Sequence, residues 1–275
     1  MRPLIAALLC LLAAFAEATI DPREYQIGLQ LYTVRDDCAK DLPGTLQAVA
    51  AMGYSGVELA GTYGRSAQDL KALLSQSHLK CYGSHINMDD LLGDNFIKTV
   101  AFNQELGNHY LIVPALSDDR RNSHDALLKT AALFNDYARR LAAFEITLAF
   151  HDEADMFRPI AGGEIPWLTL MSNTDKRVAI EFDTGNALEG GAQAAPYVAK
   201  FPGRVLSVHL KDYSATKPMV LLGEGDEDWK DLLPLLKGKA GTKWFIIEQE
   251  TYPFPPLECA RKCLENFKRM MGDKG

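Results

Sequence analysis

Short apolar runs alternate with longer segments of helical periodicity along most of the chain. Eight of these runs have the length and the β-branched or aromatic content of strands. They span residues 26–32, 55–59, 80–85, 109–114, 146–151, 178–183, 205–213 and 244–250. A segment with apolar residues at helical spacing follows each run and is a predicted helix. These helices span residues 42–52, 66–77, 95–106, 123–144, 165–171, 192–200, 229–236 and 256–271.

The alternation of strands and helices predicts an α/β fold. Short apolar strands in strict alternation with helices indicate a parallel sheet, and eight units in about 250 residues favour a closed (β/α)8 TIM barrel. An open, doubly wound sheet is the alternative, but no glycine-rich phosphate turn follows the first strand. No linker, low-complexity tract or charge block follows Glu24, so residues 24–275 are predicted to form a single domain.

The first residues have the pattern of a cleaved secretory signal peptide. Met1-Arg2 precedes an apolar run over residues 3–15, and small residues up to Ala18 offer cleavage sites. We therefore expect residues 1–18 to be removed and the mature protein to be exported, either to a periplasm or out of the cell. The apolar run is short for a membrane span, so no membrane association is expected after cleavage.

Charge and cysteine content restrict the partners and the role of the thiols. The chain of 275 residues has a formal net charge of −7 and contains no basic run, which argues against a nucleic-acid surface. The cysteines beyond the signal segment are too few for a disulfide scaffold, and we interpret them as structural. They are Cys38, Cys81, Cys259 and Cys263.

Ionisable side chains mark the ends of the predicted strands, where a (β/α)8 barrel carries its chemistry. Because faces alternate along a strand, Ser207, His209 and Lys211 share one face, as do Glu181 with Asp183 and Glu248 with Glu250. Such groups converging at one sheet edge are typical metal ligands. In chain order, the eight ends carry Arg35, Glu58, His85, Pro114, His151 with Glu153, Asp183, His209 with Lys211, and Glu248.

Several short motifs together resemble the xylose isomerase-like barrel family of sugar phosphate isomerases and epimerases. They lie at residues 28–36, 52–58, 183–186, 209–212, 223–225 with 228–229, and 248–249. The resemblance implies one divalent metal ion, which could be Mn, Mg, Co, Fe or Zn, held by the ends of the last four strands. Asp183, His209 and Glu248 take three of the ligand positions. His151 takes the fourth, where related ketose epimerases carry a glutamate.

The resemblance also implies catalytic and substrate-binding roles. Glu248 would act as a base on one face of a bound sugar, while His151, Glu153 or Lys211 would act on the other, with His151 as the first choice. The expected substrate contacts are Arg35, Glu58, His85 and Glu153.

Structural roles are the alternatives for several of these residues. Glu58 and Glu181 could be polar residues of the barrel interior paired with arginine or lysine. His85 could brace a ligand, and Lys211 could pair with Asp212. Residues 223–225 and Asp228 could only turn a loop and cap a helix.

The expected function is a metal-dependent sugar isomerase or epimerase that abstracts a proton next to a carbonyl through a stabilised enediolate. The leading alternative is a lyase or hydrolase that acts on 3-keto-glycosides by β-elimination at the same site. An apurinic-site endonuclease and a non-catalytic sugar-binding protein are remote alternatives. The expected partner is a small sugar, keto-sugar or glycoside, and export favours an unphosphorylated one. A homo-oligomer is compatible with the sequence.

Overall fold

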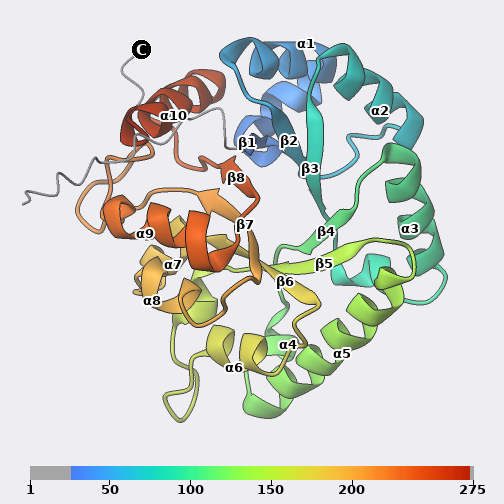
Figure 1. The fold of residues 1–275 in the computed structure, drawn as a ribbon, viewed down its shortest axis with the longest axis vertical. Helices are drawn as coiled ribbons and strands as arrows, with labels where there is room; N and C mark the ends of the chain where they lie inside the picture. Colours follow the sequence, from blue (N-terminus) through green and yellow to red (C-terminus); the bar gives the residue numbers. More distant parts are fainter. Residues whose placement is uncertain (1–25, 273–275) are drawn as a thin grey trace, which may run out of the picture.

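Eight parallel strands form a closed barrel in the computed structural model, which describes residues 26–272. The strands follow chain order around the barrel, and the first pairs with the last in parallel (Figure 1). This confirms the predicted (β/α)8 TIM barrel. The strands are β1 (Gln26–Gln30), β2 (Gly56–Leu59), β3 (Lys80–His85), β4 (Tyr110–Val113), β5 (Thr147–His151), β6 (Val178–Asp183), β7 (Val205–Leu210) and β8 (Trp244–Ile247).

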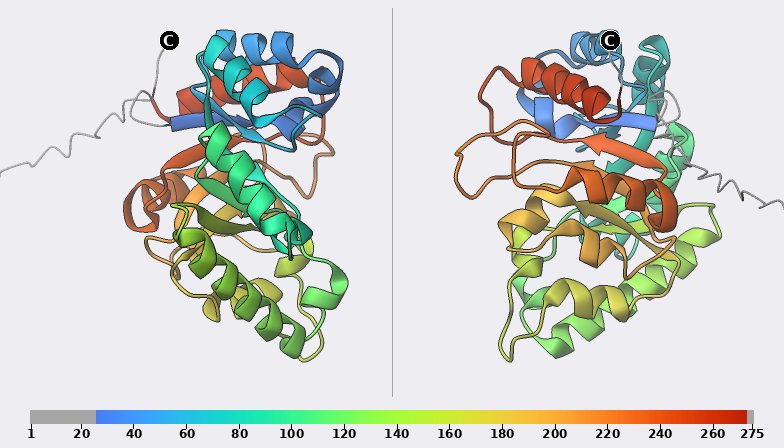
Figure 2. Two further views of the ribbon diagram at one scale, coloured as in Figure 1. Left: turned by 90° about the vertical axis from the view of Figure 1, so that its right-hand side faces the viewer. Right: turned by 60° about the vertical axis from the view of Figure 1, so that its left-hand side comes forward.

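Helices surround the barrel and cover the outer faces of its strands (Figure 2). They are α1 (Arg35–Met52), α2 (Ala67–Gln76), α3 (Asn95–Leu106), α4 (Asp118–Arg121), α5 (His124–Ala142), α6 (Pro166–Ser172), α7 (Thr184–Glu189), α8 (Ala194–Val198), α9 (Trp229–Leu235) and α10 (Pro256–Met270). Apolar side chains between this helical layer and the strands make up the main core.

Two helices differ from their predicted bounds for local reasons. The first begins at Arg35 rather than Leu42, because a helical segment merges into it across a kink at Asp41. In the second half, α7 follows β6 directly. Its start is favoured by Asp183, whose side chain accepts a hydrogen bond from the backbone N–H of Asn186 at 2.8 Å. The predicted helix over residues 192–200 is therefore only the short α8.

The last two strands each end three residues earlier than the predicted 205–213 and 244–250. β7 stops at Leu210 and β8 at Ile247, so Lys211 and Glu248 are the first residues beyond their strands. The barrel therefore places both side chains at its C-terminal opening.

Aromatic side chains pack together at the opposite end of the barrel. Tyr110 and Trp244 begin β4 and β8, and their ring centroids lie 4.8 Å apart. Tyr82 packs beside Trp244 at 6.4 Å and fills the space that a Cβ would need at Gly28 and Gly56. These glycines admit the tyrosine ring to the barrel interior.

The described residues agree with the interpretation of the cysteines as structural, because all four are free and three are buried. Among residues 26–272, no helix has the length and apolar character needed to cross a bilayer. The predicted signal segment, residues 1–18, lies outside the described residues.

Candidate active site

A layer of ionisable side chains crosses the C-terminal mouth of the barrel, and we call it the ionic layer. All of its members are buried except His85, which is half-buried. The layer consists of Glu58, His85, His151, Glu181, Asp183, His209, Lys211 and Glu248. Pairing of β6 with β7 sets Asp183 beside His209, as expected for polar residues at adjacent strand ends.

His209 lies at the centre of the ionic layer, and its two ring nitrogens face different carboxylates. Nδ1 lies 3.1 Å from Glu248 Oε2 and 3.6 Å from Asp183 Oδ2. Nε2 lies 2.8 Å from Glu58 Oε1 and 3.2 Å from Glu181 Oε1. One nitrogen therefore faces the predicted metal ligands, while carboxylates on the other side fix the orientation of the ring.

Glu181 lies one layer deeper and is surrounded by histidines. Its Oε1 atom lies 2.9 Å from His85 Nε2 and 3.3 Å from His151 Nδ1, while Ser207 donates a hydrogen bond of 2.5 Å to Oε2. The expected pairing of Glu181 with arginine or lysine is wrong, because histidine rings occupy that space.

Glu58 is also fully buried and does not pair with arginine or lysine. Besides His209, it accepts a hydrogen bond of 2.7 Å from Gln30 Nε2 and lies 3.0 Å from His85 Nε2. Glu58 was expected to contact substrate, yet its carboxylate lies beneath the histidines and has no exposed surface.

Lys211 bridges three carboxylates at the opening. Its Nζ atom lies 2.8 Å from Asp183 Oδ2, 3.2 Å from Glu248 Oε2 and 2.8 Å from Glu250 Oε2. The alternative pairing of Lys211 with Asp212 is wrong, since the Asp212 carboxylate instead accepts hydrogen bonds from loop backbone groups and from Trp229.

Attraction between opposite charges keeps the ionisable groups of the ionic layer charged, although they are buried. Burial opposes the charge of His85, but Glu58 and Glu181 outweigh it and raise its pKa to about 9. Burial also opposes ionisation of Glu248, but Lys211 and His209 outweigh it and hold the pKa of this carboxyl well below its ordinary value. For Lys211 the surrounding carboxylates likewise outweigh burial and raise the pKa well above its ordinary value.

Two groups of side chains could each hold a metal ion. Asp183, His209 and Glu248 offer ligand atoms that all lie within 4.8 Å of one another, and so do His85, His151, Glu181 and His209. The donor set of the first group, two carboxylates and an imidazole, fits a divalent ion. His151 falls in the second group, and its Nε2 atom lies 3.9 Å from Asp183. Of the four predicted ligands, His209 therefore belongs to both groups, Asp183 and Glu248 belong only to the first, and His151 belongs only to the second.

A pocket of about 320 Å³ opens above the ionic layer, and we call it the mouth pocket. Five of the predicted catalytic and binding residues line it: His85, His151, Glu153, Lys211 and Glu248. Arg35 does not line it, because its guanidinium is held by the Tyr32 carbonyl and the Tyr252 hydroxyl at 3.0 and 2.7 Å. The structure therefore leaves Arg35 and Glu58 outside the pocket wall, and the candidate metal ligands Asp183 and His209 are fully buried and do not line it either.

Several lining residues were not predicted from the sequence. Glu250 and Asn186 face the mouth pocket, as do Tyr32 and Asn87. The sequence signal for Glu250 was its place on the same strand face as Glu248. Asn87 and Asn186 follow strands within loops or short helices, where alternation gives no indication of direction.

The barrel and the polar groups at its strand ends define a class of TIM barrels with a candidate active site at the C-terminal mouth. Within that class, the chain belongs to the family described as Xylose isomerase-like TIM barrel, whose profile matches residues 46–270. This confirms the family resemblance. Proteins named as isomerases, epimerases and dehydratases are among its similar proteins.

Individual proteins show the extent of this similarity. The chain is 25% identical to the rhizopine catabolism protein MocC of Rhizobium meliloti, over 84% of this chain and 82% of the relative. It is 30% identical to inosose dehydratase of Salmonella agona (strain SL483), over 37% of this chain and 41% of the relative. A solved sugar phosphate isomerase/epimerase from Parabacteroides distasonis ATCC 8503 has a TM-score of 0.76 at 19% identity and covers 96% of this chain and 98% of its own.

Proposed function

We propose that this chain is a divalent-metal-dependent enzyme that isomerises or epimerises a sugar or keto-sugar by removing a proton next to its carbonyl. The observation that carries this proposal is the convergence of buried Asp183, His209 and Glu248 on one point below the mouth pocket. A divalent ion bound by these residues, whether Mn, Mg, Co, Fe or Zn, would polarise the carbonyl and acidify the adjacent C–H bond.

The surrounding residues supply the proton transfers. Glu248 lines the mouth pocket and has a lowered pKa, so it is an ionised carboxylate available as a base on one face of the sugar. His151 and Glu153 line the same pocket and are the candidates for the other face. Returning the proton to the opposite face of the same carbon gives the epimer, and returning it to the neighbouring carbon gives the isomer.

Elimination is the second candidate reaction, and the position of Lys211 favours it. Its ammonium group lies at the rim of the mouth pocket, between Glu248 and Glu250. A proton at this position can be donated to an oxygen that leaves from the carbon beyond the abstracted hydrogen. The name of the similar inosose dehydratase also states a loss of water. A lyase or hydrolase of 3-keto-glycosides would use the same residues.

The N-terminal pattern and the charge support the remaining parts of the proposal. Residues 1–18 have the pattern of a signal peptide, so we propose an exported enzyme that acts on an unphosphorylated small molecule. The net charge of −7 supports a sugar-type substrate over a nucleic acid.

Metal content and hydrogen exchange together test the proposed function. Purified protein should contain about one divalent ion per chain by elemental analysis and should exchange the α-hydrogen of a ketose with D2O. Asp183→Ala should lose both the ion and the exchange while circular dichroism shows a folded barrel. The matched control is Glu105→Ala, at an exposed carboxylate on α3. Unchanged metal content in Asp183→Ala, or no exchange with any ketose or 3-keto-glycoside, would contradict the proposal.

A further inference from the structure

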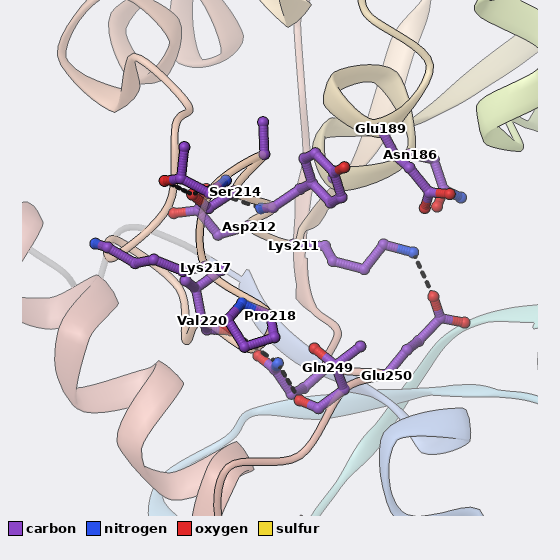
Figure 3. Close-up of a pocket in the computed structure, with 15 residues that line it drawn as sticks. Asn186, Glu189, Lys211, Asp212, Ser214, Lys217, Pro218, Val220, Gln249 and Glu250 are labelled. Carbon is purple, nitrogen blue, oxygen red and sulfur yellow. Dashed lines mark hydrogen bonds and ion pairs between the residues drawn. The ribbon is translucent and has the colours of Figure 1, made fainter.

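A second and larger pocket lies beside the mouth pocket, and the reaction described above leaves it unused. It has a volume of about 520 Å³, and we call it the loop pocket because the segment between β7 and α9 forms much of its wall. The two pockets share Asn186, Lys211 and Glu250 as lining residues. Figure 3 shows the Lys211 side chain reaching toward Glu250 across this shared boundary. The two pockets therefore adjoin at the Lys211–Glu250 ion pair.

The lining of the loop pocket suits an uncharged polyol or a sugar ring. Ser214, Thr216 and Asn186 offer hydroxyl and carboxamide groups, while Pro218 and Val220 offer apolar surface. A few polar groups set among apolar ones are typical of small-molecule sites.

The cations of the loop pocket already have partners. Lys211 pairs with Glu250, and Lys217 Nζ donates to the backbone carbonyl of Glu224 at 3.0 Å. No arginine lines this pocket. A phosphate group would find no arginine fork there and would face the carboxylates of Glu189 and Glu250 in the same wall, which favours a neutral ligand.

The wall of the loop pocket is held in place by contacts within the segment itself. The Asp212 carboxylate accepts hydrogen bonds from the backbone N–H groups of Gly223 and Gly225 at 2.8 and 3.1 Å and from Trp229 Nε1 at 3.0 Å. A Cβ atom at Gly225 would collide with this carboxylate, so the turn requires glycine. The motif residues around 223–229 therefore do more than turn the loop, because they shape the pocket before any ligand binds.

From the shared boundary and the separate volumes, we propose that the substrate is a glycoside, with its keto-sugar ring in the mouth pocket and its second unit in the loop pocket. The second unit is a sugar ring or an aromatic aglycone. This inference rests on the proposed function, because that function places the reacting ring above Asp183, His209 and Glu248. It adds the substrate class and assigns the loop pocket as the binding site for the part of the substrate that does not react.

Binding of two matched probes tests the proposal. 3-Ketoglucose and its 4-nitrophenyl β-glycoside would be titrated calorimetrically into Glu248→Gln protein, in which the reacting carboxylate is removed to prevent turnover. The glycoside should bind about tenfold more tightly or better. Thr216→Trp, at an exposed residue that lines only the loop pocket, should abolish this preference and leave the affinity for 3-ketoglucose unchanged. The matched control is Ser172→Trp, at an exposed hydroxyl on the last turn of α6.

The possible outcomes separate this inference from the proposed function. Equal affinity for the two probes, failure of the glycoside to bind, or an equal loss of both affinities in Thr216→Trp would overturn the glycoside assignment. If wild-type protein still exchanges the α-hydrogen of free ketoses in D2O, the proposed function survives that result. Conversely, a glycoside preference that Thr216→Trp removes supports the loop pocket even if no exchange is observed.

Discussion

The two ends of the barrel interior are built from opposite kinds of side chain. At the N-terminal end, Tyr110 and Trp244 pack with small apolar residues of the neighbouring strands. At the C-terminal end, the ionic layer fills the same cross-section with carboxylates, imidazoles and one ammonium group. Burial of apolar surface stabilises the first end, whereas burial of charges costs free energy unless each charge is paired. The first end therefore supports the fold, whereas the second carries the groups that the proposed reaction needs.

A short hydrogen-bonded chain joins the two ends. The Ser207 hydroxyl donates to Glu181, so its oxygen remains free to accept, and the Tyr110 hydroxyl lies 3.2 Å from it. Tyr110 therefore donates to Ser207. This chain connects the aromatic end with the deepest carboxylate of the ionic layer, and substitutions on either side of it can separate stability from activity.

Glu248→Gln should have the largest effect on activity. The carboxamide keeps an oxygen near the metal position but cannot act as a base, so hydrogen exchange should fall by about 10²–10⁴-fold. Loss of the Glu248 charge also weakens the buried pairs with Lys211 and His209, so thermal stability should fall as well, but the loss of exchange is the larger effect. The rate of α-hydrogen exchange in D2O, measured by NMR on metal-loaded protein, checks this. Exchange at the wild-type rate would remove Glu248 from the proton transfer.

Tyr110→Ala should have the converse effect. The ring is 2% exposed, and its loss leaves a cavity at the aromatic end, so the free energy of unfolding should fall by about 3–5 kcal/mol. Protein that remains folded at low temperature should still bind its metal ion. Denaturant unfolding and elemental analysis measure the two quantities. A variant with normal stability but no metal would show that the two ends do not divide their roles in this way.

Glu58→Gln should have a smaller effect, confined to the ionic layer. Glu58 orients His209 through the 2.8 Å contact with Nε2, and loss of such a contact to a ligand weakens metal affinity by about 10–100-fold. Competition with a chelator measures this affinity, and Glu105→Gln is the exposed control. If affinity remains at the wild-type value, the orientation of His209 does not depend on Glu58.

Glu227→Gln should have the smallest effect on metal binding and activity, because Glu227 belongs neither to the aromatic end nor to the ionic layer. Burial, followed by repulsion from Asp212, raises the pKa of Glu227 from 4.5 to about 7. The folded state therefore retains a proton that the unfolded state has released, and stability falls as pH rises from about 4.5 through 7. The variant should lack this loss and be up to about 3 kcal/mol more stable than wild type at pH 8, with no such gain at pH 4. Denaturant unfolding at both pH values measures the difference, and an equal difference at the two values would contradict this linkage.

Strand patterning predicted the fold and the residues of the ionic layer but not their depth. The alternation of Ser207, His209 and Lys211 gave the correct face, because side-chain direction depends only on position along a strand. Glu181 and Asp183 share a face of β6 yet lie about 6–7 Å apart along the strand, since each strand residue advances about 3.3 Å. This difference places Glu181 among the histidines and Asp183 near Lys211.

Besides depth, the register in which neighbouring strands pair could not be predicted from the sequence. Pairing shifts between Val57 and Glu58 on β2 and between Ile180 and Glu181 on β6, next to the two carboxylates that face His209 Nε2. Such irregularities depend on packing between neighbours rather than on the composition of one strand. Glu58 itself precedes the last residue of β2, Leu59, so its carboxylate lies beneath the pocket wall rather than in it.

The wall of the loop pocket combines a fixed base with a solvent-exposed tip. The fixed part of the wall depends on Asp212, Gly225 and Trp229, whose contacts leave little room for substitution. Residues 215–219 at the tip are all exposed, so changes there should cost the fold little. A library randomised only at these five positions would therefore alter ligand preference at small risk to folding. The same arrangement would let related barrels diversify their specificity during evolution while the catalytic residues stay unchanged.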